Sequence, residues 1–136
     1  LSTGQDVASA MQMGADLAYM GTRFINTTES EANQEYRDMI IASETKDITY
    51  TAAISGVSAN FLSKSLDNAG ITQQQRESKG KIDFGKEMDT EAKAWKTIWS
   101  AGQGVTTIED NLPIKELLLG MKTEFKDAIA KQQAIA

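Results

Sequence analysis

A short apolar run that ends in a Gly-Thr turn is the part of this chain whose residue types could do chemistry. Leu17-Ala18-Tyr19-Met20 is followed directly by Gly21 and Thr22. Glycine lets a ligand approach the backbone closely, and Thr22 adds a hydroxyl to the backbone amides of the turn. Such donors suit the oxygens of a phosphate group. The turn therefore indicates a phosphate contact, although taken alone a Gly-Thr pair is more typical of an ordinary turn.

The absence of histidine and cysteine limits what the chain can catalyse by itself. Histidine is the usual general base near neutral pH, and without cysteine there is no thiolate nucleophile, disulfide or zinc ribbon. Catalysis within this chain would depend on carboxylates, lysine or tyrosine. The acidic pairs Glu31/Glu35 and Glu87/Glu91 have no third ligand near them in sequence. We interpret them as solvated helix faces and expect no metal site.

The elements that would position the Gly-Thr turn can be read from capping and periodicity. Thr3 and Asp6 form a capping pair that opens a short helix, and the apolar run predicts a buried parallel strand over about 16–21. Thr28 and Glu31 form a second capping box before a helix with Tyr36 and Ile40 on one face.

The rest of the chain is predicted to be mostly helical. β-Branched residues indicate an extended segment over 48–54, and the apolar residues Phe61, Leu62 and Leu66 indicate a short helix. Residues 67–86 are polar and predict a loop, and helical spacing returns near Asp89. Pro113 begins a long amphipathic helix.

Composition excludes several classes of partner. The 136 residues have a formal net charge of −5, so no basic surface for nucleic acid is expected. No apolar run approaches the roughly 18 residues of a membrane span, and no stretch resembles a signal peptide. We expect a cytoplasmic protein with no membrane or nucleic-acid partner.

Glycine-containing blocks in a fixed order make the pattern more specific than any block alone. In this order the chain resembles the C-terminal part of the nitronate monooxygenase family, formerly called 2-nitropropane dioxygenases. The matching blocks are Gly14-Ala15-Asp16, Met20-Gly21-Thr22-Arg23-Phe24, Ser55-Gly56-Val57, Ala59-Asn60-Phe61-Leu62, Ala101-Gly102-Gln103-Gly104-Val105 and Leu112-Pro113.

The resemblance implies an α/β fold, the C-terminal portion of a (β/α)₈ TIM barrel that is predominantly helical in this segment. It also implies a non-covalently bound FMN and the oxidation of alkyl nitronates by O₂ to carbonyl compounds and nitrite. By the same resemblance, Tyr19, Met20, Gly21 and Thr22 contact FMN after the last barrel strand, and Gln103 is a further cofactor contact. Arg23 is expected either to aid the phosphate or to pair with a neighbouring carboxylate.

The catalytic histidine of the family lies upstream of the matching region, so the resemblance assigns no catalytic residue to this chain. We expect residues 1–136 to be about the last two-fifths of an enzyme and to be inactive alone. One alternative is a flavin-dependent enoyl-acyl-carrier-protein reductase, which shares the barrel and a similar turn. Another is a non-catalytic helical remnant that associates with itself, because a single strand over 16–21 needs a pairing partner.

Overall fold

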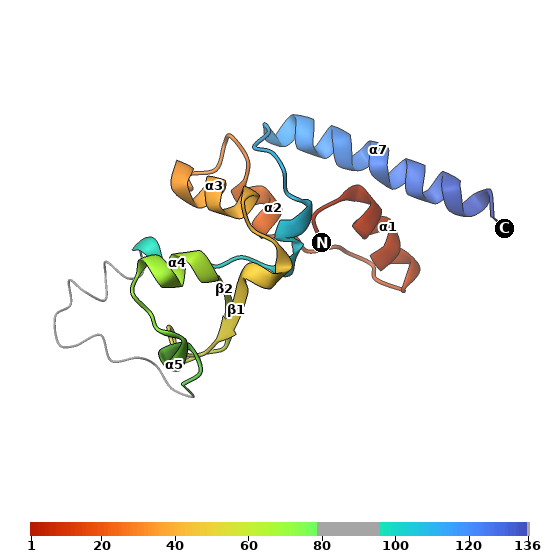
Figure 1. Ribbon diagram of the computed structural model, residues 1–136. Coiled ribbons are helices and arrows are strands. Elements are labelled where there is room, and N and C mark those ends of the chain that lie inside the picture. The colour runs from red at the N-terminus through yellow and green to blue at the C-terminus, as the bar shows by residue number, and fades with distance from the viewer. Residues whose placement is uncertain (79–95, 136) are drawn as a thin grey trace.

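The computed structural model describes residues 1–78 and 96–135 (Figure 1). Helices and short 3₁₀ turns surround one antiparallel hairpin. The elements are α1 (Gly4–Gln12), α2 (Thr22–Ile25), α3 (Gln34–Ile41), η1 (Thr45–Asp47), β1 (Ile48–Thr51), β2 (Ala59–Leu62), α4 (Ser63–Asn68), α5 (Gln73–Arg76), η2 (Gln103–Thr107) and α7 (Ile114–Gln133). Among the described residues, no helix combines the length and apolar character that a membrane crossing requires.

The hairpin of β1 and β2 divides the core into two apolar clusters. The strands pair antiparallel from Ile48↔Leu62 to Thr51↔Ala59. The segment before η2 continues this pairing, because the N–H of Leu62 donates to the carbonyl of Trp99 at 2.9 Å. Successive side chains of a strand point to opposite faces. One cluster comprises Ile40, Leu62, Trp99, Ala101, Val105 and Ile108, and the other comprises Ile54, Phe61, Leu66, Ile71 and Ile98.

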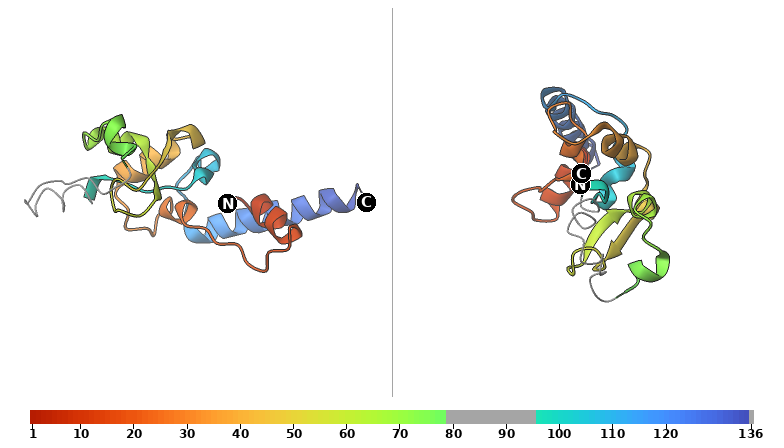
Figure 2. Two further views of the ribbon diagram at one scale, coloured as in Figure 1. Left: turned by 90° about the horizontal axis from the view of Figure 1, so that it is seen from below. Right: turned by 90° about the vertical axis from the view of Figure 1, so that its left-hand side faces the viewer.

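The first and last helices lie side by side, as both Figure 1 and Figure 2 show. The predicted capping box of α1 is confirmed, since Thr3 and Asp6 each accept a backbone N–H from the other residue. The N–H of Gly4 donates to the carboxylate of Glu124 on α7 at 2.6 Å. A Cβ at Gly4 would lie 1.9 Å from the carbonyl oxygen of Met121. Only glycine therefore permits this approach of the two helices.

The start of α7 is fixed by a carboxylate from a distant loop. Pro113 was predicted to be the first residue of the helix, but it is the N-cap, one position earlier, and the N–H of Ile114 donates to both carboxylate oxygens of Glu29 at 3.0 Å. This hydrogen bond holds the pKa of Glu29 below its usual value. A negative charge at this end is also favourable for the helix dipole.

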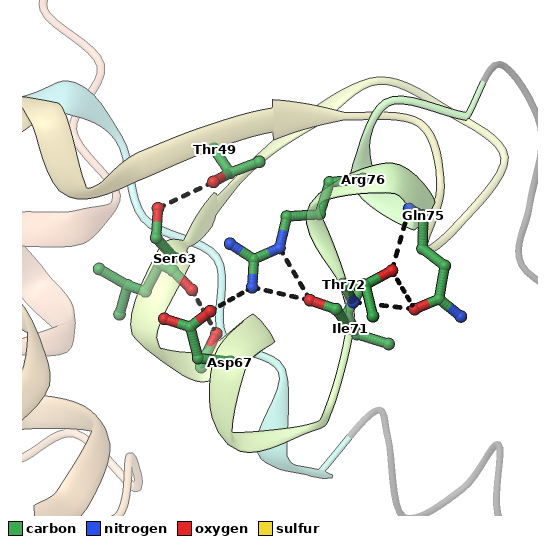
Figure 3. A network of polar contacts seen from close by, with 9 residues as sticks. Thr49, Ser63, Asp67, Ile71, Thr72, Gln75 and Arg76 are labelled. Carbon is green, nitrogen blue, oxygen red and sulfur yellow. Dashed lines mark hydrogen bonds and ion pairs between the residues drawn. The ribbon is translucent and has the colours of Figure 1, made fainter.

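A polar network joins α4 to α5 (Figure 3). The guanidinium of Arg76 donates from Nε and Nη2 to the carbonyl of Ile71, and it pairs with Asp67 at 2.5 Å. The side chain of Arg76 is only 9% exposed. The hydroxyl of Thr49 on β1 lies 2.8 Å from the hydroxyl of Ser63 at the start of α4. The bonds of Arg76 hold Asp67, Ile71 and Arg76 together, within the segment 67–86 that the sequence predicts to be a loop.

Several predicted elements differ from the structure. The strand predicted over about 16–21 is absent, and Leu17 and Tyr19 are 90% and 92% exposed. A strand requires a hydrogen-bonded neighbour, and among the described residues none pairs with this segment. The third helix begins after Asn33, whose side chain accepts the N–H of Tyr36, so the predicted box at residues 28–31 is wrong.

Two further predictions concern the middle of the chain. The extended segment is confirmed over Ile48–Thr51, but Phe61 and Leu62 belong to β2 rather than to a helix, because cross-strand pairing outweighs their helical spacing. Within the predicted loop 67–86, residues Gln73–Arg76 form α5 behind a capping box, while 79–86 lie outside the described residues. The helix expected from Asp89 also lies mostly outside them.

Candidate functional site

The Gly-Thr turn lies at the edge of a hollow of about 340 Å³. Gly21 is exposed and precedes α2, and an ideal Cβ there would meet no atom within 4 Å. The N–H groups of Gly21 and Thr22 have no acceptor among the described residues. Open space and free amides at the same turn leave room for a ligand to contact the backbone.

A hydrogen bond joins this turn to a segment eighty positions away in the sequence. The N–H of Gly102 donates to Oγ1 of Thr22 at 2.8 Å. Because the hydroxyl of Thr22 accepts this bond, its own proton remains available to donate elsewhere. A Cβ at Gly102 would lie 3.5 Å from the same oxygen, so the two segments are in close contact.

The hollow is formed by three of the sequence blocks that are widely separated along the chain. Its walls come from the turn and α2, from the start of β2, and from the segment that precedes η2. The lining residues are Gly21, Thr22, Ile25, Ala59, Asn60, Ser100, Ala101 and Gly102. None of them is charged and several are apolar, so the polar groups of the hollow are backbone amides, hydroxyls and one side-chain amide. These are donors that suit phosphate oxygens, so the residues present fit a phosphate-containing cofactor.

The other predicted contacts lie outside the hollow. Tyr19 is 92% exposed, and neither Tyr19 nor Met20 lines the hollow. Gln103 is also exposed and absent from its walls, and its carbonyl accepts the hydroxyl of Thr45 at 3.1 Å. The structure therefore brings together Gly21, Thr22 and the glycine next to Gln103. The side chains of Tyr19 and Gln103 point to solvent.

Arg23 takes the second of the two roles considered for it. Its side chain is 6% exposed and forms an ion pair with Asp110, and its Nη1 donates to the Asp110 carbonyl at 3.2 Å. It lines a separate hollow of about 220 Å³ against α7. Arg23 therefore joins α2 to the segment before α7 rather than facing the Gly-Thr turn.

Tyr36 fixes the wall that includes Ser100. Its ring stacks on Trp99 with centroids 5.1 Å apart and an interplanar angle of 15°. Its hydroxyl donates to the carbonyl of Ser100. Burial raises the pKa of Tyr36, so the phenol stays protonated at neutral pH and keeps this bond. Trp99 is a buried core residue, and Trp95 lies outside the described residues.

Asn60 lines the hollow, although it was not predicted to be a site residue. It belongs to one of the matching blocks, but no role was assigned to its side chain. Only the strand pairing puts it beside Thr22. A polar residue within an otherwise apolar run, Ala59-Asn60-Phe61-Leu62, was the signal that could have identified it.

Comparison with known proteins gives consistent matches across the chain. The sequence model of a family described as nitronate monooxygenase matches residues 1–124. A protein named nitronate monooxygenase from Paraburkholderia phytofirmans is 30% identical over 141 residues, which cover 98% of this chain and 38% of that protein.

Solved structures give the same fold. FabK from Thermotoga maritima has a TM-score of 0.74 and 23% sequence identity to this chain. The match covers 100% of this chain and 45% of the FabK chain. Nitroalkane oxidase from Streptomyces ansochromogenes has a TM-score of 0.71 and 23% sequence identity to this chain. The match covers 96% of this chain and 39% of the oxidase chain. These neighbours are TIM-barrel enzymes, and the partly helical structure described above is consistent with a portion of such a barrel. The chain spans about two-fifths of the length of the relatives it matches.

Proposed function

The chain belongs to the nitronate monooxygenase family, and on this premise we propose that the protein is an FMN-dependent oxidoreductase that converts alkyl nitronates and O₂ to carbonyl compounds and nitrite. The observation that carries the proposal is the convergence of three matching blocks on one hollow. The turn at Gly21-Thr22, the start of β2 and the segment before Gly102 line it together. The three blocks are far apart in sequence, and none of the residues that line the hollow is charged.

In this proposal the hollow receives the phosphate end of FMN. The amides of Gly21 and Thr22 and the Thr22 hydroxyl donate to phosphate oxygens, and Gly21 leaves space for the approach. Met20 and Tyr19 contribute through the backbone, since the Tyr19 side chain faces solvent. Gln103 contributes through the position of its loop, which the Thr22–Gly102 bond fixes. When bound, FMN supplies the redox chemistry; the described residues supply binding and orientation.

Flavin binding and nitrite release test the proposal. We expect the full-length protein to bind FMN and to release nitrite from an alkyl nitronate in the presence of O₂. A protein that purifies colourless and does not bind added FMN would refute the proposal. Consumption of NAD(P)H with an enoyl thioester, without nitrite release, would instead identify the reductase alternative.

The isolated 136-residue chain is expected to bind substrate poorly and to be inactive, because it contains no histidine to act as a base. Nitrite production by this chain alone would contradict that expectation. Reaction mixtures containing FMN and nitronate without protein supply the background rate.

Self-association is a second candidate role for the isolated chain, favoured by the exposure of Leu17 and Tyr19. Both side chains are at least 90% exposed. Sedimentation of the purified chain tests it directly. A folded monomer at all concentrations would exclude association.

A further inference from the structure

Asn60 occupies a position in β2 that directs its side chain toward the proposed phosphate site. Alternation along the strand places Asn60 on the same face as Leu62, whereas Phe61 faces the second apolar cluster. Leu62 is fully buried, but Asn60, one pair further along the hairpin, is only half-buried and lines the hollow with Thr22. It is therefore a polar residue on a face that is otherwise apolar.

The side-chain amide of Asn60 makes no hydrogen bond to residues 1–78 or 96–135. No hydrogen-bond partner accompanies it in the described part of the chain, and its cross-strand neighbour Tyr50 is 71% exposed. An asparagine side chain offers two N–H donors and one acceptor oxygen. A half-buried amide without a protein partner keeps its donors available for a group that enters the hollow.

No charged residue lines the hollow that Asn60 faces. The lining residues include neither a carboxylate to repel an anion nor a lysine or arginine to attract one. A phosphate bound there depends on neutral donors, namely the amides of Gly21 and Thr22, the Thr22 hydroxyl and the Asn60 amide. Each neutral donor then contributes a large share of the binding, because hydrogen bonds to a charged group are stronger than those between neutral groups.

We propose that Nδ2 of Asn60 donates a hydrogen bond to the phosphate of FMN, opposite the amides of Gly21 and Thr22. This inference rests on the proposed function. It adds a phosphate-binding side chain from β2 to the backbone donors of the turn, so that the hairpin and the Gly-Thr turn bind the same group from two sides.

The test compares FMN with riboflavin, which has the same ring system and lacks the phosphate. Full-length apoprotein is titrated with each flavin, as wild type and as the variants Asn60→Leu and Asn60→Asp. We expect Asn60→Leu to weaken FMN binding about 10- to 100-fold, the range for one hydrogen bond to a charged group. Riboflavin binding should not change. Asn60→Asp should weaken FMN binding at least as much, because a carboxylate repels the phosphate.

The ratio of the two dissociation constants is measured on a single preparation, so partial unfolding of a variant cancels. Asn68→Leu is the matched control, since Asn68 is exposed at the end of α4 and does not line the hollow. It should leave both constants unchanged.

The possible results separate the inference from the proposed function. Loss of the preference for FMN in both Asn60 variants supports the phosphate contact. If the wild type prefers FMN and the variants keep that preference, Asn60 does not contact the phosphate, although the proposed function stands. Equal weakening of both flavins would show that Asn60 acts through packing and would also overturn the inference. A wild-type protein that binds no flavin would refute the inference and the proposed function together.

Discussion

Replacement of Gly4 by alanine tests whether the close approach of α1 and α7 is as tight as the structure indicates. The added Cβ would lie 1.9 Å from the carbonyl oxygen of Met121 and 2.8 Å from the backbone nitrogen of Phe125. Real Cβ contacts essentially never fall under 3.0 Å, so the helices must separate by at least about 1.1 Å. The obstructing atoms belong to the α7 backbone, which cannot turn aside as a flexible side chain would.

The cost follows from two effects of this separation. Forcing a methyl group into a packed contact typically costs about 1–3 kcal/mol. The bond from the Gly4 N–H to the Glu124 carboxylate, 2.6 Å long, would also be stretched or lost. Hydrogen bonds to charged groups contribute about 1.5–3 kcal/mol. These effects are not additive, and we expect the free energy of unfolding to fall by about 2–4 kcal/mol.

Urea unfolding of the 136-residue chain, followed by far-ultraviolet circular dichroism, measures this loss. With an m-value of about 2 kcal/mol/M, the midpoint should fall by about 1–2 M. Gly120→Ala is the matched control, because Gly120 is inside α7 and a Cβ there meets no atom within 4 Å. That change should raise stability by up to about 1 kcal/mol through helix propensity. If Gly4→Ala is as stable as the wild type, the two helices do not pack as described.

The remaining predictions concern caps and one long-range bond. Burial acts to raise the pKa of Asp6, but backbone N–H donors lower it more strongly. The pKa of Asp6 in the folded protein therefore lies below its value in the unfolded chain. The stability that Asp6 contributes is therefore complete above the unfolded pKa and is lost as the pH falls through the folded value. Denaturation curves recorded between about pH 5 and 2 should show this loss of stability for the wild type, and Asp6→Asn should reduce it. Glu29→Gln should lower the melting temperature by weakening the cap on Ile114, with a smaller difference at high salt; an effect independent of salt would contradict the charge argument. Thr22→Val leaves the Gly102 N–H without its acceptor and should cost about 1 kcal/mol in urea unfolding, whereas Thr22→Ser should retain most of that stability.

Local signals in the sequence were sufficient for the two packed helices. The capping box of Thr3 and Asp6 and the sustained apolar period after Pro113 predict α1 and α7, because both signals depend on residues within one or two turns. The segment 16–20 has equally clear apolar character but forms no strand in the described structure. A strand depends on a neighbour that its own sequence cannot specify.

The site was predictable in part for the same reason. Gly21 and Thr22 stand out because of their residue types, and the resemblance extends the prediction to the loop containing Gln103. The bond between Thr22 and Gly102, and the ion pair of Arg23 with Asp110, join residues more than 75 positions apart. No local pattern predicts such pairs, so the side chain of Asn60 could not be placed beside Thr22 before β2 and its pairing were known.

The pairing of α1 with α7 also sets an order for biosynthesis. Gly4 leaves the ribosome before its partner Glu124, which follows 120 residues later. Throughout that interval the apolar face of the first helix has no α7 to pack against, and a helix of this length is only marginally stable in water by itself. Closure over so long a loop is slow compared with local helix formation. The nascent chain therefore exposes this face until α7 has been synthesised, and the exposed face is a suitable target for a chaperone that recognises short apolar segments.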